Sequence, residues 1–394
     1  MTRYIVPAEV EKIAREADIA EIIAEYVPLT RSGQSYKGLC PFHSEKTPSF
    51  VVSPEKRVFH CFGCGAGGNV FTFIMKWDGV DFPTAVQTIA TKIGLSISTD
   101  ERTTGHKERM YHSAERVCSF YQRMLQRNTT ANNYLKQRGL RPEITSVFRL
   151  GWAPESRQFL DFCQKSGLPN PLLQKLGLIR QNPEGSSYAY FRRRLIFPVL
   201  TWSGKVTGFG ARVLDNSTPK YLNSPQSPIF SKGQMLYGLH LAREHIRHSG
   251  QAILVEGYMD VIALHQVDIK NAVASLGTAL TPSQVTLLKR YANTVTLAFD
   301  EDSAGQIATV KGIDLLLEQG LNVRILSLPQ GKDPAEAMQH GEKDSFIRQL
   351  QSATDYIDYR IKTAVEQNSP LTTQNKLKVI GTLLPTLNLS LIHI

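Results

Sequence analysis

The spacing of apolar residues divides the chain into blocks of different predicted structure. Between residues 10 and 27, apolar side chains recur at helical spacing, which predicts an amphipathic helix. Short apolar runs broken by glycine, proline and cysteine predict the strands of a small ribbon between 50 and 62, and helical spacing returns at 69–94. We therefore predict a small domain at 1–100, followed by a polar, charged linker at 101–110.

The rest of the chain changes from mixed structure to strands that alternate with helices. The block at 111–249 begins at helical spacing and becomes rich in strands around 191–214. From 250 to 332, buried apolar runs alternate with helical segments, which predicts a largely parallel sheet covered on both faces. From 333 to 388 the pattern is mostly helical. The predicted fold class is α+β with several domains: a ribbon with helices, a mixed α/β core containing a Rossmann-like parallel sheet, and the start of a helical segment.

Positive charge is concentrated in one part of the chain. The 394 residues carry a formal net charge of +10, and a basic excess indicates an anionic partner such as nucleic acid. Between Ser186 and Gly250 there are nine lysines or arginines but two acidic residues, with tyrosines interleaved. This pattern predicts a groove for single-stranded nucleic acid, although a charge run by itself is more often a solvated face. The candidate residues are Arg193, Lys205, Arg212, Lys220, Tyr221 and Lys232.

The sequence also indicates where the protein works. No stretch approaches the ~20 apolar residues that span a bilayer, and the N-terminus lacks the pattern of a signal peptide. We therefore expect a cytoplasmic protein with no membrane partner. In a reducing compartment disulfides are rare, and Cys118 and Cys163, which stand alone among apolar neighbours, are expected to be buried thiols.

Two pairs of metal-ligating residues predict a zinc site. Cys40 and His43 are separated by two residues, and so are Cys61 and Cys64. A two-residue gap lets one tight turn direct both side chains at the same ion, and a ribbon brings the second pair opposite the first. Four protein ligands indicate one structural zinc ion. His60, next to Cys61, is an alternative ligand.

Aromatic and basic residues are interleaved around these pairs, a combination that suits single-stranded nucleic acid because bases stack and phosphates pair. The alternative is that the aromatic rings form the core of a ribbon too small to have another. The residues concerned are Phe42, Phe50, Phe59 and Phe62, with Lys37, Lys46, Lys56 and Arg57.

Carboxylates follow three predicted strands in the block at 250–332. Glu256 ends the first, Asp300 ends the second and is followed by Asp302 two residues later, and Asp333 ends the third. The carboxyl ends of parallel strands share one edge of a sheet, so these acids are expected to converge. Clustered carboxylates repel one another unless cations lie between them, and Mg²⁺ prefers such oxygen ligands. Two ions ~4 Å apart would serve synthesis or cleavage of phosphodiester bonds equally well.

Taken together, these motifs resemble those of the bacterial replicative DNA primases. The matching segments are CPFHSEKTPSF at 40–50, FHCFGCGAGG at 59–68, YLKQRGL at 134–140, RLGWAP at 149–154, TPKYLNSP at 218–225, FSKGQMLYGL at 230–239, VEGYMD at 255–260 and FDEDSAG at 299–305. They run in the family's order over nearly the whole chain.

The resemblance implies a zinc-binding domain followed by a polymerase core with a TOPRIM subdomain at 250–332. Such a protein makes short RNA primers from nucleoside triphosphates on single-stranded DNA at the replication fork, with Mg²⁺ or Mn²⁺ as catalytic ions and the replicative helicase as partner. The implied metal ligands are Glu256, Asp300, Asp302 and Asp333, the first three being catalytic. Arg138, Lys220 and Lys232 match positions that contact template or nucleotide.

Two departures from the family pattern concern the catalytic ions. The chain has Glu301 between the two aspartates where the family usually has glycine. It also has Ala335 where the family often has a second aspartate, which removes one ligand of the second ion and leaves Glu336 as a substitute.

Two other functions remain open from the residues alone. A TOPRIM nuclease or topoisomerase would use the same acids to cleave DNA, and a topoisomerase would also need an activated tyrosine. A zinc adaptor that binds single strands without catalysis would not need Glu256.

The end of the chain departs from the family. The helical domain that docks on the helicase in the family is missing, and residues 389–394 resemble the translation of a sequencing adapter. We expect a truncated sequence whose last six residues are an artefact.

Overall fold

In the computed structural model, the described residues are 7–43, 45–78, 80, 82–95, 101–277, 279–298, 312–326, 333–370 and 372–391. The chain divides into two compact units, residues 1–106 and 107–394. The boundary falls within the stretch that the sequence assigned to a linker. The backbone of that stretch is helical: α5 (Glu101–Gln126) begins at residue 101, where the predicted linker also begins. Glutamate, lysine and arginine favour a helix even where no apolar face requires one.

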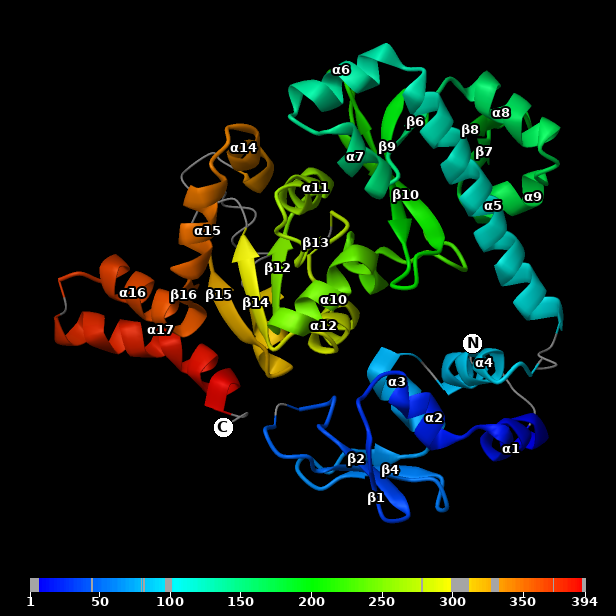
Figure 1. The fold of residues 1–394 in the computed structure, drawn as a ribbon. Helices are drawn as coiled ribbons and strands as arrows, with labels where there is room; N and C mark the ends of the chain where they lie inside the picture. The colour runs from blue at the N-terminus through cyan, green and yellow to red at the C-terminus, as the bar shows by residue number, and fades with distance from the viewer. Residues whose placement is uncertain are drawn as a thin grey trace. The chain divides into compact units, whose positions relative to one another are not determined.

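The smaller unit is an antiparallel sheet packed against helices (Figure 1). Its strands, in order across the sheet, are β1 (Thr30–Ser32), β2 (Ser35–Gly38), β3 (Phe50–Ser53), β4 (Val58–Cys61) and β5 (Gly67–Gly68). Its helices are α1 (Pro7–Glu16), α2 (Ile19–Ala24), α3 (Val70–Asp78) and α4 (Phe82–Lys92).

Side chains of β3 and β4 alternate between the core and the solvent, as the two-residue period of a strand requires. Phe50 and Phe59 face inward, where their ring centroids lie 5.3 Å apart, and Phe59 meets Phe73 of α3 at 5.6 Å. Val58 and His60 face outward. The alternative that these aromatic rings form the core of the ribbon is therefore confirmed for Phe50 and Phe59, which are not available to stack on bases.

The larger unit begins with helices around an antiparallel sheet, whose strand order is β11-β10-β9-β6. Its elements are α5, α6 (Thr129–Gln137), α7 (Pro142–Val147), β6 (Gly151–Ala153), α8 (Ser156–Lys165), α9 (Asn170–Lys175), β7 (Ile179–Gln181), β8 (Ser187–Ala189), β9 (Arg194–Leu200), β10 (Val206–Val213) and β11 (Tyr221–Asn223). Every residue of β9 and β10 is buried, so this sheet is covered on both faces.

A second sheet follows, in the order β13-β12-β14-β15-β16. The first four of these strands pair in parallel, and β16 is antiparallel to β15. The elements are η1 (Lys232–Gln234), α10 (Leu239–Ser249), β12 (Gln251–Val255), α11 (Tyr258–Gln266), β13 (Ala272–Ala274), α12 (Pro282–Lys289), β14 (Thr294–Ala298), β15 (Asn322–Ile325), α14 (Pro334–Gln339), α15 (Lys343–Gln351), β16 (Thr354–Asp355), α16 (Tyr356–Gln367) and α17 (Thr373–Leu391).

Alternate residues of β12 belong to two different hydrophobic clusters. Ile253 and Val255 pack in a cluster with α11, whereas Ala252 and Leu254 pack in a cluster with α10 and α12. Figure 1 shows these helices around the sheet. Because successive side chains of a strand point to opposite faces, helices cover both faces of the sheet. The predicted fold class, including the mainly parallel sheet, is confirmed.

Tyr258, at the start of α11, joins the two sheets. Its ring stacks on Phe197 of β9 with centroids 4.9 Å apart, and it lies directly over Gly210 of β10, where a Cβ atom would come within 2.4 Å of the ring. Its hydroxyl group donates a hydrogen bond to the side-chain oxygen of Asn223 in β11. The start of α11 is therefore held against the antiparallel sheet by packing and by a hydrogen bond.

The described C-terminal part is mostly helical, from α14 to α17, and residues 392–394 lie outside the described residues. No helix within the described ranges combines the length and the hydrophobicity that a bilayer span requires.

Replacing Gly210 by alanine is predicted to destabilise the larger unit by about 1–3 kcal/mol, because the added methyl group overlaps the buried ring of Tyr258. The measurement is thermal unfolding. Gly381→Ala, on an exposed part of α17 with open space around the added atom, is the control and should leave stability unchanged or slightly raised. Equal melting temperatures for the two variants would contradict the described packing.

Candidate metal centres and nucleic-acid interface

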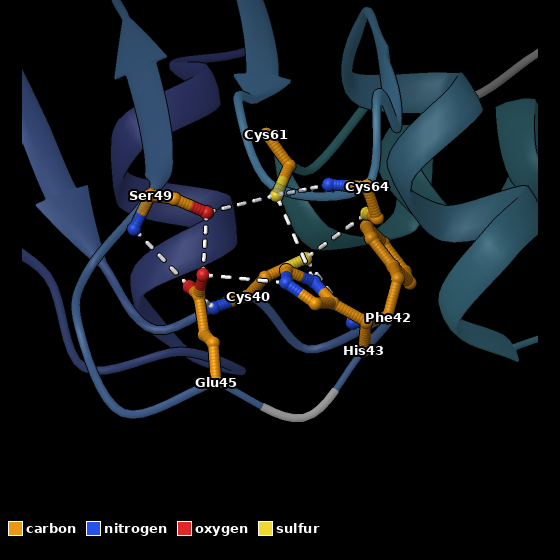
Figure 2. Close-up of polar contacts among 7 residues, drawn as sticks. All are labelled: Cys40, Phe42, His43, Glu45, Ser49, Cys61 and Cys64. Carbon is orange, nitrogen blue, oxygen red and sulfur yellow. Dashed lines mark hydrogen bonds and ion pairs between the residues drawn. The ribbon is translucent and has the colours of Figure 1, made fainter.

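The four residues of the predicted zinc site converge in the smaller unit (Figure 2). One potential ligand atom from each of Cys40, His43, Cys61 and Cys64 lies within 4.8 Å of all the others. Sγ of Cys40 is 3.8 Å from Sγ of Cys64, and Sγ of Cys61 is 3.8 Å from Nδ1 of His43. A tetrahedron with bonds of ~2.3 Å has edges of about 3.8 Å, so these donors fit a zinc ion.

Backbone geometry at each pair of ligands favours ionised sulfur. The N–H group of Phe42 points to Sγ of Cys40 at 3.4 Å, and the N–H group of Cys64 points to Sγ of Cys61 at 3.5 Å. Burial raises the pKa of the Cys40 thiol to about 12. Burial acts in the same direction on Cys61, but hydrogen bonds, including those from the backbone N–H groups of Gly63 and Cys64, outweigh it and lower the pKa to about 6.

Gly63 is required by the close approach of the second turn to the histidine. A Cβ atom at this position would lie 2.7 Å from Nε2 of His43 and 2.9 Å from Oγ of Ser49. The alternative ligand His60 lies on the outward face of β4, where its ring contacts Phe62 with centroids 4.7 Å apart. The strand period thus separates His60 from the cluster, while the Phe62 side chain remains 74% exposed.

Of the four predicted acidic ligands, the described residues include Glu256 and Asp333. Glu256 directly follows β12, at the carboxyl end of that strand. Asp333 is the N-cap of α14, where one of its oxygens accepts a hydrogen bond from the N–H group of Glu336 at 2.6 Å. A carboxylate has two oxygens, so this bond leaves the other as a possible ligand atom. Asp300 and Asp302 lie outside the described residues.

Asp260, which the sequence analysis did not single out, connects the helices around this edge. One of its oxygens accepts a hydrogen bond from the N–H group of Gly257 at 2.9 Å, and the other accepts one from the N–H group of Ala335 at 3.2 Å. It therefore fixes the residue after Glu256 to the first turn of α14. The available signal was an acid near the start of a helical segment, which indicates a cap but not the contact with α14.

The basic side chains fall into separate groups. Arg212 is 8% exposed and lies between the rings of Tyr134 and Tyr221, at 5.1 and 5.4 Å, and it donates a hydrogen bond to the hydroxyl oxygen of Tyr221. Arg138 lies over the ring of Tyr134, 5.5 Å from its centroid. We refer to Arg138, Tyr134, Arg212 and Tyr221 together as the stack. Although Tyr221 is 36% exposed, desolvation of its hydroxyl group raises its pKa to about 12, so the phenol stays protonated at neutral pH.

Arg212 forms no ion pair in the part of the chain that the structure describes, although the charge of Asp260 acts on the neighbouring phenol of Tyr221. Among the same described residues, Nε of Arg212 is buried without a hydrogen-bond partner. Burying an unpaired guanidinium group is costly. An anion beside the stack would offset part of that cost.

Two other predicted basic residues are engaged elsewhere. Lys205 precedes β10, at the end opposite to Arg212, and its ammonium group is 2.8 Å from a carboxylate oxygen of Glu108. Arg193 is 3.5 Å from Glu155 at the surface. Lys220 is exposed next to β11, and Lys232 is half-buried at the start of η1.

The loop that carries Arg138 is attached to the parallel sheet's helices. The side chain of Gln266, at the end of α11, accepts a hydrogen bond from the N–H group of Arg141 at 2.8 Å and donates one to the carbonyl oxygen of Gly139 at 2.9 Å. Gln339, in α14, donates to the carbonyl oxygen of Gln137. The loop is therefore held against the two helices that follow Glu256 and Asp333.

Comparison with known families divides the chain into three matched segments. Residues 5–105 match a CHC2 zinc finger, residues 120–243 match the N-terminal domain of the DNA primase catalytic core, and residues 253–338 match a Toprim-like domain. The matches follow the order of the elements described above.

Individual proteins with similar sequences are DNA primases. The chain is 45% identical to the DNA primase of Clostridium acetobutylicum over 363 residues, which is 91% of this chain and 61% of that protein. It is 38% identical to the DNA primase of Aquifex aeolicus over 91% of this chain and 72% of the relative. The chain thus spans about 60–70% of the length of these relatives.

Solved structures show the same likeness. The crystal structure of the zinc-binding and RNA polymerase domains of the Aquifex aeolicus primase matches with a TM-score of 0.65 and 35% identity, covering 97% of this chain and 93% of that one. A structure of a DnaG primase catalytic domain bound to single-stranded DNA matches with a TM-score of 0.65 and 34% identity, covering 73% of this chain and 94% of that one.

Cys61→Ser is predicted to abolish zinc retention and to unfold the smaller unit while the larger one stays folded, because a structural zinc ion supplies folding free energy directly. Metal content by mass spectrometry and thermal unfolding measure the two effects. Cys163→Ala removes a buried thiol outside the cluster and should keep the full zinc content. Undiminished zinc in Cys61→Ser would show that the ligand assignment is wrong.

Proposed function

Because the chain belongs to the DNA primase family, we propose that it is a nucleotidyltransferase that synthesises short RNA primers on single-stranded DNA for replication. The observation that carries the proposal is the connection between the acidic strand end and the basic, aromatic stack. Tyr258, two residues after Glu256, donates a hydrogen bond to Asn223, two residues after Tyr221. Asn223 in turn donates to the carbonyl oxygen of Leu276 after β13.

This connection supports a single reaction site on the larger unit. Tyr258 and Asn223 hold the carboxyl end of β12 close to β11, which carries Tyr221 beside Arg212. Gln266 holds the loop of Arg138 to the same helix. A nucleic-acid strand or triphosphate bound at the stack would therefore have its phosphates near Glu256.

In the proposed reaction, the 3′-hydroxyl group of one nucleotide attacks the α-phosphate of the next, and pyrophosphate leaves. Glu256, Asp300, Asp302 and Asp333 would hold the divalent ions, Mg²⁺ or Mn²⁺, and carboxylate oxygens are the donors that these ions prefer. Bound ions of this kind lower the pKa of an attacking hydroxyl group and neutralise the charge of the leaving group. Glu256 is also our candidate for accepting the proton of the hydroxyl group.

The remaining side chains would bind and orient the substrates. Arg138 and Arg212 would contact phosphates of the template or of the nucleotide, and the ring of Tyr221 would support a base. Lys220 and Lys232 would extend this surface along the strand. Arg193 and Lys205 are already paired with carboxylates and would contribute less, as outlying phosphate contacts.

The smaller unit would bind one structural zinc ion through Cys40, His43, Cys61 and Cys64. The exposed ring of Phe62 offers a surface for stacking on a template base. We further propose a cytoplasmic location at the replication fork, with the replicative helicase as partner, as the family membership implies.

Glu256→Gln should reduce primer synthesis by roughly 100-fold or more, because one metal-binding carboxylate is worth several kcal/mol of transition-state stabilisation. The measurement is template-dependent incorporation of labelled ribonucleotides on single-stranded DNA with Mg²⁺ or Mn²⁺. Glu244→Gln makes the same chemical change in α10, at an exposed acid paired with arginines, and should leave synthesis unchanged.

The same assay separates the alternatives. DNA cleavage without added triphosphates would favour a TOPRIM nuclease or topoisomerase. Template binding that survives Glu256→Gln, with no turnover in the unmodified protein, would favour a non-catalytic adaptor.

Arg212→Gln should weaken binding to single-stranded DNA by roughly 10-fold or more, since a hydrogen bond to a charged phosphate contributes about 1.5–3 kcal/mol. The slope of log K against log salt concentration should become less steep by ~0.7 for each phosphate that the variant no longer neutralises. Arg247→Gln is the matched control, at an arginine of α10 that is paired with Glu244 and lies outside the proposed interface, and melting curves verify that both variants fold. Unchanged affinity and slope in a folded Arg212→Gln variant would remove the stack from the proposed interface.

A further inference from the structure

One acidic side chain of the smaller unit lies beside the zinc ligands without belonging to them. The side chain of Glu45 is 10% exposed, and its Oε2 atom lies 3.3 Å from Nε2 of His43 (Figure 2). Its Oε1 atom accepts hydrogen bonds from the N–H groups of Cys40, at 2.7 Å, and Ser49, at 3.1 Å. The hydroxyl group of Ser49 donates to Oε2. The carboxylate is thus surrounded by donors rather than by sulfur.

The two ring nitrogens of His43 face different groups. Nδ1 lies 3.8 Å from Sγ of Cys61, at the distance expected between two ligands of one zinc ion, whereas Nε2 faces Glu45. A neutral histidine that binds a metal through Nδ1 carries its proton on Nε2. A hydrogen-bond acceptor at Nε2 therefore determines both the tautomer and the orientation of the ring.

We propose that Glu45 is the positioning residue of the zinc site: it accepts the Nε2–H group of His43 and thereby directs the Nδ1 lone pair at the ion. The proposal does not depend on the activity of the larger unit. Glu45 contacts the ring of His43 at Nε2. The backbone of Gly63 restricts movement of the ring at the same nitrogen, because a Cβ atom at Gly63 would lie 2.7 Å from Nε2.

The same carboxylate also organises the turn that presents the first ligand. Through Cys40 and Ser49, Glu45 connects the end of β2 to the start of β3. Removal of Glu45 would therefore loosen a loop as well as free a histidine ring. The experiment has to distinguish these two effects.

The first measurement is zinc affinity of the full 394-residue chain, determined by competition with a coloured chelator. Glu45→Ala should weaken zinc binding by about 10–100-fold, the range found when the hydrogen-bond partner of a metal-bound histidine is removed. Glu45→Gln keeps a neutral acceptor and should lie between Glu45→Ala and the unmodified chain. Glu55→Gln changes an exposed glutamate of the same unit and should have no effect.

A second background separates positioning of the ring from bracing of the loop. His43→Cys supplies a fourth thiolate, which binds zinc without an N–H group for Glu45. In this background Glu45→Ala should cost little or no affinity, because the proposed role is lost with the ring. An equal loss of affinity in both backgrounds would show that Glu45 only braces the loop, and it would overturn the proposal.

A third measurement identifies the tautomer of His43 directly. Nitrogen chemical shifts of the ¹⁵N-histidine-labelled, zinc-loaded chain report which nitrogen of the ring carries the proton. Protonation at Nε2 with metal on Nδ1 is the expected result, and zinc bound through Nε2 would overturn the assignment. In Glu45→Ala, the Nε2 proton should exchange with water faster than in the unmodified chain.

Discussion

Tyr258 packs its ring between the two sheets of the larger unit, and the geometry of the proposed reaction site depends on that contact. The ring stacks on Phe197 and meets Tyr237 edge to face at 4.7 Å, while Gly210 leaves room for it in β10. Its hydroxyl group is satisfied by Asn223, as a buried phenol requires. Tyr258 follows Glu256 by two residues, so the packing that joins the sheets also sets the position of the acid.

Charge is placed on this scaffold at a cost in solvation. Arg212 is buried, and within the described residues two tyrosine rings and one hydroxyl group stand where a carboxylate would usually be found. The faces of aromatic rings attract a cation without cancelling its charge. The positive potential therefore stays available for a phosphate, in contrast to Lys205, whose charge is compensated by Glu108.

The stability of the smaller unit is limited by its short chain. Its core combines the rings of Phe50, Phe59 and Phe73 with aliphatic side chains, and it buries two of the four proposed zinc ligands. In a domain of this size a metal ion replaces part of the missing hydrophobic core. Ordering of the ligands by side chains such as Glu45 lowers the entropy that zinc binding must overcome.

The spacing of residues along the chain was sufficient to predict much of the fold and of the candidate sites. Two-residue gaps identified Cys40, His43, Cys61 and Cys64, because two ligands separated by only two residues must lie on the same turn. Continuous apolar runs that alternate with helical segments predicted the parallel sheet, because both faces of such a sheet are buried. The end of the first run placed Glu256 at a strand end. These features depend on neighbours along the chain, so a single sequence was sufficient to predict them.

The tertiary structure decided what depends on contacts between distant residues. Asp260 bonds to a residue 75 positions away and Gln266 to one 125 positions away, and no local pattern contains such pairs. Similarly, Phe59 and Phe62 look alike in sequence, but only the first enters the core, and Arg212 and Lys205 share a strand region but have different partners. Sequence spacing determines which side chains point the same way, whereas packing between elements determines what they meet.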